Sequence, residues 1–163
     1  MKRKLYILLT ACVLNLCCLT TPAFAQNKMF EKYSDMENVE YICITRSMIK
    51  LMGQKKNVNI NGVKVNGFSD AIKVILIINS GDETARKQMK ADFEKLKADS
   101  HYELLMVAKD NTSRVTTLYN SKDETQELVM YISEEDEQTF VILTGKMTED
   151  MINKLLASDE NDQ

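Results

Sequence analysis

The chain alternates between apolar runs and short polar stretches, and the period of the apolar positions predicts its elements. Residues 73–79 (KVILIIN) are apolar almost throughout. Such a run is typical of a strand that is buried on both faces and lies in the interior of a sheet. A long helix is predicted next, starting at a capping box formed by Ser80 and Glu83. Its single apolar stripe, which we expect to cover the sheet, consists of Ala85, Met89, Phe93 and Leu96.

Four more strands are predicted after this helix, separated by short polar turns. Turns of this length join antiparallel neighbours, so the four strands are expected to form a meander. A final helix follows, with Thr148 as its cap and with Met147 and Ile152 at the spacing of a hydrophobic staple. The predicted strands span residues 102–109, 114–120, 127–132 and 138–144.

The region before residue 73 mixes short helices with strands. A strand is predicted over 39–45, because VEYICIT is rich in β-branched and aromatic residues. Helical turns are expected on either side of it, at 28–34 and 47–52, and a small hairpin around Asn61-Gly62. The fold class is therefore α+β, an antiparallel β-meander sheet with helices packed on one face.

The first 25 residues have the pattern of a secretory signal peptide. A basic segment, residues 2–4, precedes an apolar run that ends at Leu19, and Ala23-Phe24-Ala25 is the small-x-small pattern that a signal peptidase cleaves. We therefore expect cleavage between Ala25 and Gln26 and a periplasmic or secreted protein. One domain is predicted over residues 26–157, followed by a polar tail over 158–163.

The leader has two alternative interpretations. Cys12 follows Leu9-Thr10-Ala11, which resembles a lipobox, so the protein is alternatively a lipoprotein attached through Cys12. A retained membrane anchor is the other alternative, but the apolar run is shorter than the ~20 residues that a membrane-spanning helix needs. Neither alternative changes the domain predicted after the leader.

Composition narrows the classes of partner. The whole chain has a net charge of −3, and removing the three cations Lys2, Arg3 and Lys4 makes it −6. An acidic domain has no electrostatic reason to bind nucleic acid or an anionic membrane. We therefore expect no nucleic-acid partner and no stable membrane insertion after cleavage.

One acidic stretch is the only candidate metal site. Glu134, Glu135, Asp136 and Glu137 follow Ser133 between two predicted strands. A calcium loop of the EF-hand type alternates its oxygen ligands and needs a glycine at its bend, and this stretch has neither. A solvated turn is the better interpretation, with weak calcium binding as the alternative.

Candidates for other chemistry are few. After the leader the chain has one histidine, His101, and one cysteine, Cys43, which is too few for a structural zinc site. We expect His101 on the surface near a helix C-terminus and Cys43 packed as a small hydrophobic side chain, with an intermolecular disulfide as an alternative for Cys43. No catalytic residue and no cofactor are predicted, and catalysis by a pair of carboxylates is kept as an alternative.

Two stretches resemble a known family. MFEKYSDMENVEYICITRSMIKLM (29–52) and ELVMYISEEDEQTFVILTGKMTEDMINKL (127–155), with YELLM (102–106), are similar to the exported family of domain of unknown function 4252. Its members are small proteins with signal peptides from Bacteroidetes-type Gram-negative bacteria. The resemblance implies an envelope location and, through neighbouring sigma and anti-sigma genes, a link to envelope stress signalling. It implies no functional residue.

These patterns together favour a non-enzymatic module that binds another envelope protein. A small carboxylate-dependent hydrolase and a homo-oligomeric scaffold are the alternatives, and the oligomeric state stays open. A binding module is expected to expose an apolar patch or a sheet edge, whereas a hydrolase is expected to bring carboxylates together in a pocket.

Overall fold

The computed structural model describes residues 28–53, 59–60, 63–64, 70–121 and 125–156. The chain divides into two compact units, Met1–Asp35 and Met36–Gln163. In the first unit, helix α2 (Lys28–Glu31) continues into the 3-10 helix η3 (Lys32–Asp35), and the element predicted over 28–34 is confirmed.

Several predicted features lie outside the described residues. They are the signal peptide with Ala23, Ala25 and Gln26 at its cleavage site, Cys12, and the polar tail over 158–163.

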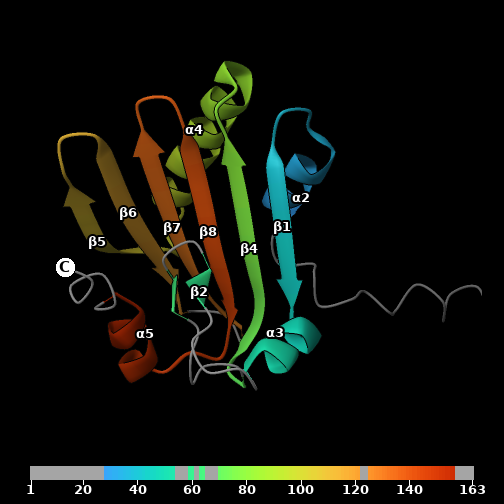
Figure 1. Ribbon diagram of the computed structural model, residues 1–163. Helices are drawn as coiled ribbons and strands as arrows, with labels where there is room; N and C mark the ends of the chain where they lie inside the picture. The colour runs from blue at the N-terminus through green and yellow to red at the C-terminus, as the bar shows by residue number, and fades with distance from the viewer. Residues whose placement is uncertain (1–27, 54–58, 61–62, 65–69, 122–124, 157–163) are drawn as a thin grey trace, which may run out of the picture. The chain divides into compact units, whose positions relative to one another are not determined.

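A six-stranded antiparallel sheet forms the second unit, with the strand order β1-β4-β8-β7-β6-β5 (Figure 1). The last four strands are neighbours in chain order, so the predicted meander is confirmed. Strand β4 lies between β1 and β8, as predicted for an interior strand. The strands are β1 (Glu40–Thr45), β4 (Ile72–Ser80), β5 (Glu103–Lys109), β6 (Ser113–Asn120), β7 (Gln126–Glu134) and β8 (Gln138–Gly145).

A separate two-stranded sheet pairs β2 (Asn59–Ile60) with β3 (Val63–Lys64) in antiparallel register. This pairing confirms the hairpin predicted in this region. The Asn61-Gly62 turn itself lies outside the described residues.

Helices α3 (Arg46–Gly53), α4 (Glu83–Ala98) and α5 (Glu149–Leu156) do not all lie on one face of the sheet. The Phe93 ring of α4 packs 6.4 Å from the ring of Phe140. Val141, the next residue of β8, belongs to an aliphatic cluster that contains Ile49 of α3 and Ile152 of α5. Successive strand residues point to opposite faces, so α3 and α5 lie opposite α4. Figure 1 shows α4 behind the sheet. The predicted packing of helices on one face is therefore not confirmed.

The start of α4 differs from the prediction. Ser80 is the last residue of β4, and its hydroxyl donates to the backbone oxygen of Asn38 over 2.6 Å. The N-cap is Asp82, whose Oδ1 accepts from the backbone N–H of Ala85 over 2.9 Å. The capping box predicted for Ser80 and Glu83 is wrong, because strand pairing with β8 keeps Ser80 in the sheet and leaves Asp82 at the cap position.

The predicted apolar stripe of α4 is confirmed, since all four of its residues are buried. Asp92 is also fully buried, which the apolar pattern does not predict. Its Oδ1 accepts hydrogen bonds from Gln88 over 3.1 Å and from Lys95 over 3.0 Å. A buried carboxylate is tolerated when such donors replace water.

The predicted start of the final helix is confirmed. The backbone N–H of Met151 donates to Thr148 Oγ1 over 3.3 Å, which caps the first turn of α5. Met147 and Ile152 are both buried in the same cluster, as a hydrophobic staple requires.

Gly145 is required where β8 approaches the start of β4. A Cβ at Gly145 would overlap the Ala71 carbonyl oxygen and lie 2.9 Å from Ile72 Cα. Backbone atoms cannot move aside as a flexible side chain can, so Gly145→Ala is expected to destabilise the fold by roughly 1–3 kcal/mol, as overpacking does. Urea denaturation measures the change. In the matched control, Gly81→Ala, the new Cβ would lie 3.3 Å from Asp136 O, and a much smaller loss is expected. Equal losses in both variants would contradict this prediction.

Asp110 organises the turn between β5 and β6. Hydrogen bonds to its carboxylate, first from the backbone of Thr112 and then from Ser113, lower its pKa from 3.8 to about 2. Because the folded pKa lies below the unfolded one, this carboxylate contributes its full stability above pH 3.8. That contribution is lost as the pH falls towards 2. A carboxyl NMR titration should place the midpoint of Asp110 near 2, and a midpoint at or above 3.8 would refute the turn geometry.

Candidate functional site

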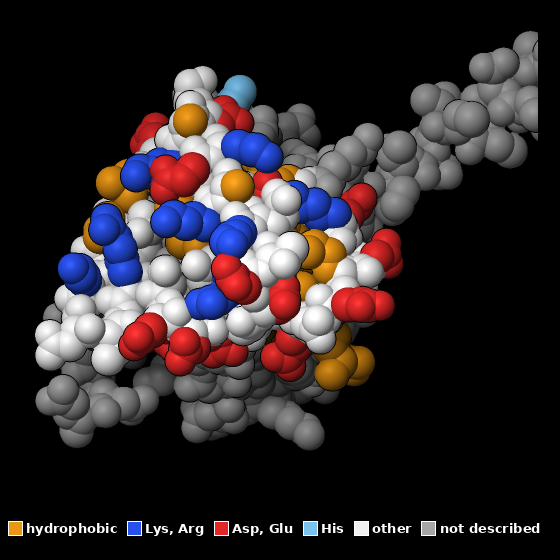
Figure 2. Space-filling view, turned by 90° about the horizontal axis from the view of Figure 1, so that it is seen from above, with side chains coloured by type: hydrophobic (Ala, Val, Ile, Leu, Met, Phe, Trp, Pro, Cys, Tyr) orange, Lys and Arg blue, Asp and Glu red, His pale blue; other side chains and the backbone are white. Residues whose placement is uncertain are grey.

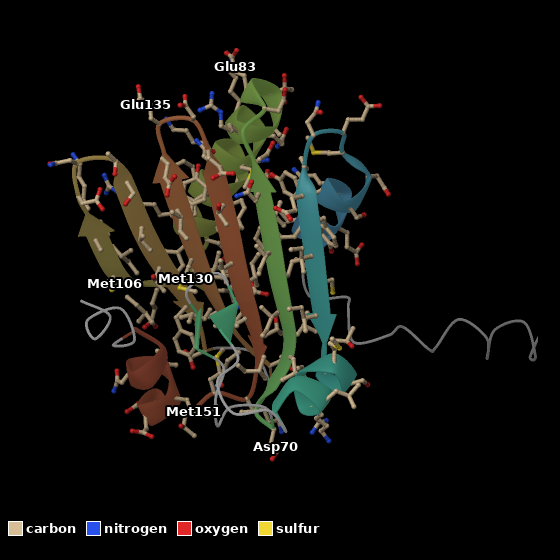
Figure 3. All side chains as sticks on the ribbon, in the orientation of Figure 1. Asp70, Glu83, Met106, Met130, Glu135 and Met151 are labelled. Carbon is tan, nitrogen blue, oxygen red and sulfur yellow. The ribbon has the colours of Figure 1, made fainter. Side chains whose placement is uncertain are left out.

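The acidic stretch forms the exposed turn between β7 and β8, as predicted. The backbone N–H of Glu134 donates to the backbone oxygen of Glu137 over 2.9 Å and closes the turn. All four acidic residues are exposed, and Glu135 points away from the end of the sheet (Figure 3). Arg86 of α4 donates to the backbone oxygen of Glu135 over 2.7 Å. Within the described ranges, no group of three or more His, Cys, Asp or Glu side chains lies close enough to hold a metal ion. Calcium binding by Glu134, Glu135, Asp136 and Glu137 stays a hypothesis.

His101 and Cys43 do not share a site, because Cys43 lies on β1 and His101 precedes β5, and these two strands are the opposite edges of the sheet. His101 follows the end of α4, is exposed as expected, and has its Nδ1 2.7 Å from Asp99 Oδ1. Cys43 is also exposed, so the prediction of a packed, buried thiol is wrong. The reason is that β1 is an edge strand of the sheet. Partial burial still raises the pKa of the Cys43 thiol above 9.0, which makes it a poor nucleophile at neutral pH.

Strand β5 is the other edge of the sheet, and it exposes large apolar side chains. Leu104 is 55% exposed, Leu105 39% and Val107 45%. The register with β6 shifts between Leu104 and Met106, so a bulge lies within the exposed segment. An edge strand also presents unpaired backbone N–H and C=O groups on its outer side. Strand β5 therefore offers both apolar area and backbone hydrogen-bonding groups to another chain.

A cavity of about 710 Å³ lies between α5 and the strands β5 to β7. Two carboxylates line it, Glu103 from β5 and Glu149 from α5. Burial, followed by the charges of Glu149 and Glu103, raises the pKa of the neighbouring Tyr119 above 10.0. Gln126 in its wall already accepts the backbone N–H of Met147 over 2.5 Å. In this cavity a pair of carboxylates faces a space of the size of a ligand site.

A second hollow is a groove of about 260 Å³ between α4 and the strands β6 and β7. Cationic side chains from both sides line it, namely Lys90, Lys97 and Arg114. Figure 2 shows Lys and Arg side chains gathered on the side of the molecule where β5 and β6 lie, with Asp and Glu more common elsewhere on that view. The net charge of the groove lining is therefore positive, whereas the net charge of the chain is negative.

The sequence did not reveal these two hollows, because each combines residues that are distant along the chain. Lys90 and Lys97 do share one side of a helix, since a spacing of seven is two helical turns. That spacing was the available signal for half of the groove. Arg114 lines the same groove as these two lysines because α4 packs across the meander. No local sequence pattern predicts that packing.

The buried carboxylate of Glu127 is a further feature that the pattern of β7 did not predict. Glu127 is 5% exposed, and Tyr102 donates its hydroxyl to Glu127 Oε1 over 2.5 Å. This bond ties the start of β5 to β7 across β6. Because a donor satisfies the carboxylate, its burial needs no ligand, and Glu127 has a structural role.

None of the helices in the described part of the chain has the length and apolar character that crossing a membrane would need.

Comparison with the curated proteins and with solved structures gave no match. The family model of domain of unknown function 4252 (DUF4252) matches residues 33–155, which include the whole six-stranded sheet, helices α3 and α4, and all of α5 except its last residue. The chain therefore belongs to the family of domain of unknown function 4252.

Proposed function

We propose that the protein is a non-enzymatic module that binds another protein of the cell envelope through strand β5. The observation that carries this proposal is the exposure of Leu104, Leu105 and Val107 on an edge strand. Large apolar side chains that gather on one edge favour an interaction site, whereas single exposed apolar residues are ordinary.

The expected mode of binding is addition of an extended partner segment to the outer side of β5. Backbone hydrogen bonds would give affinity, and alternate side chains would give specificity. Covering a fully exposed Leu or Val side chain stabilises a complex by roughly 1.5–3 kcal/mol, so half-exposed side chains contribute about half of that each. The bulge after Leu104 limits indiscriminate pairing with other edges.

The proposed location is the periplasm, reached by export and cleavage after Ala25. The support is the leader pattern in residues 1–25. The resemblance of the sequence to the family implies the same location. A role in envelope stress signalling is part of the same proposal, because the resemblance to the family implies such a link.

A carboxylate-dependent hydrolase is the second candidate, and the cavity lined by Glu103 and Glu149 favours it. Hydrolysis by two carboxylates requires one to act as an acid and the other as a base or nucleophile across a cleft. In this cavity one carboxylate comes from a strand and the other from the short helix α5. The homo-oligomeric scaffold ranks third and would use the same β5 edge.

Photo-crosslinking tests whether β5 is the contact surface. A photoreactive amino acid in place of Val107 should form one predominant adduct with another protein in the native envelope, because Val107 is exposed on the edge strand. The same amino acid in place of Lys50 on α3 is the control and should give none. Adduct masses are read by mass spectrometry.

Leu104→Lys should remove most of the Val107 adduct, because it places a charge in the apolar contact. An adduct between two copies of this chain would instead support the scaffold. Absence of any adduct, together with turnover that Glu103→Gln abolishes, would support the hydrolase.

The position of signal cleavage has its own test. Protein purified from the periplasm should begin at Gln26 when its intact mass is measured, since Ala23 and Ala25 provide the small side chains that the peptidase accepts. Ala25→Phe should leave the leader attached, whereas Gln26→Phe should be cleaved normally. A purified chain that retains Lys2, or that carries lipid on Cys12, would overturn the proposed processing.

A further inference from the structure

We infer that the groove between α4 and the strands β6 and β7 is a binding site for an oxyanion, such as a phosphate, sulfate or carboxylate group of a small ligand. The groove lies apart from the outer edge of β5, and its test is independent of the protein-binding proposal. Three observations support the inference: a cluster of three cations, two of which form no ion pair among the described residues, hydroxyl groups on the floor, and the size of the groove.

The cations come from two elements and face one groove. Lys90 and Lys97 lie on one side of α4, and Arg114 lies on β6. Lys97 has a weak ion pair with Glu94, at 3.9 Å. Neither Lys90 nor Arg114 forms an ion pair with any residue that the structure describes.

The balance of charge in the groove is opposite to that of the chain. Three cations stand against the single carboxylate of Glu94, an excess of two positive charges in a chain whose net charge is −3. Like charges that converge repel one another, and a bound anion removes that repulsion. Arginine in such a position can hold an oxyanion through two parallel hydrogen bonds, whereas lysine acts as a point charge.

Hydroxyl groups complete the polar lining. Arg114 is opposite Ser133 in the β6–β7 register, and Thr116 is opposite Tyr131. The two strands thus present Ser133 and Thr116 on the same face as Arg114, where both hydroxyls line the groove. A hydroxyl can donate to an oxyanion that a neighbouring cation holds.

The ring of Tyr131 forms an uncharged, apolar part of the groove floor. Its ring stacks on Phe93 at a centroid distance of 4.3 Å, and both rings are buried. Burial, with a smaller contribution from Glu94, raises the pKa of Tyr131 to about 12, so its hydroxyl stays uncharged at neutral pH and does not compete with an anion. An aromatic floor strengthens the attraction between the cations and an anion above it, because the local dielectric is lower than in water.

The groove volume of about 260 Å³ sets the size of the ligand. It suits a single oxyanion group or a small molecule that carries one, and it is short of the roughly 300–1,000 Å³ of drug-sized ligand sites. The same chemistry is present in free phosphate, in a phosphate ester of a small alcohol, and in an anionic lipid headgroup.

Titration of the purified, folded protein with sodium phosphate tests the inference. Amide NMR shifts should saturate at Arg114, Thr116 and Ser133, while sodium chloride at the same ionic strength should not reproduce them. Lys90→Gln combined with Arg114→Gln should weaken phosphate binding at least tenfold. Both side chains are exposed, so the variant should retain its thermal midpoint. Lys50→Gln on α3 removes a charge elsewhere and should leave the affinity unchanged.

Two further probes distinguish the source of the oxyanion. Tighter binding of glycerol 3-phosphate than of phosphate would identify a small ester, and binding to phosphatidylglycerol vesicles but not to phosphatidylcholine vesicles would identify a lipid headgroup. Shifts that do not saturate, or that chloride reproduces, would overturn the inference, as would equal weakening by Lys50→Gln and by the double variant.

Discussion

The pairing of β4 with β1 and β8 is the constraint on which the second unit depends. Within the six-stranded sheet, β4 is the strand that joins β1 to the meander formed by β5 to β8. Its residues from Ile75 to Ile78 are all buried, so both faces of the strand are covered. At its start, the chain approaches Gly145 so closely that no side chain fits there. After its end, Asp82 is the N-cap of α4, and this helix runs back across the sheet.

This arrangement determines which parts of the sheet are covered. Helix α4 follows directly from an interior strand, and its aromatic contacts reach Tyr131 of β7 and Phe140 of β8. One helix about 10 Å across covers roughly two strands spaced ~4.8 Å apart. Beyond β7 the sheet continues for two more strands, and there the groove opens and Leu104 and Val107 are exposed. The candidate binding surfaces are thus a consequence of the position of α4.

Much of the fold could be predicted from local patterns, because period and turn length act over a few residues. The run at 73–79 indicated a strand buried on both faces, and the short turns indicated the meander. Local reasoning failed where a distant contact decides. Strand pairing takes Ser80 away from the helix cap, and the edge position of β1 exposes Cys43. Hydrogen-bond donors permit Asp92 to be buried. Neither the groove nor the exposed edge could be predicted, because both require the strand order and the placement of α4.

Amide hydrogen exchange tests whether a fully paired β4 anchors a sheet whose β5 edge is left open for a partner. The purified protein is measured alone and after incubation with its native envelope fraction. The expected result is that β4 exchanges most slowly in both samples, whereas β5 exchanges quickly alone and becomes protected in the envelope sample. Slow exchange of β5 in the isolated protein, or no change in β5 with the envelope fraction, would contradict it.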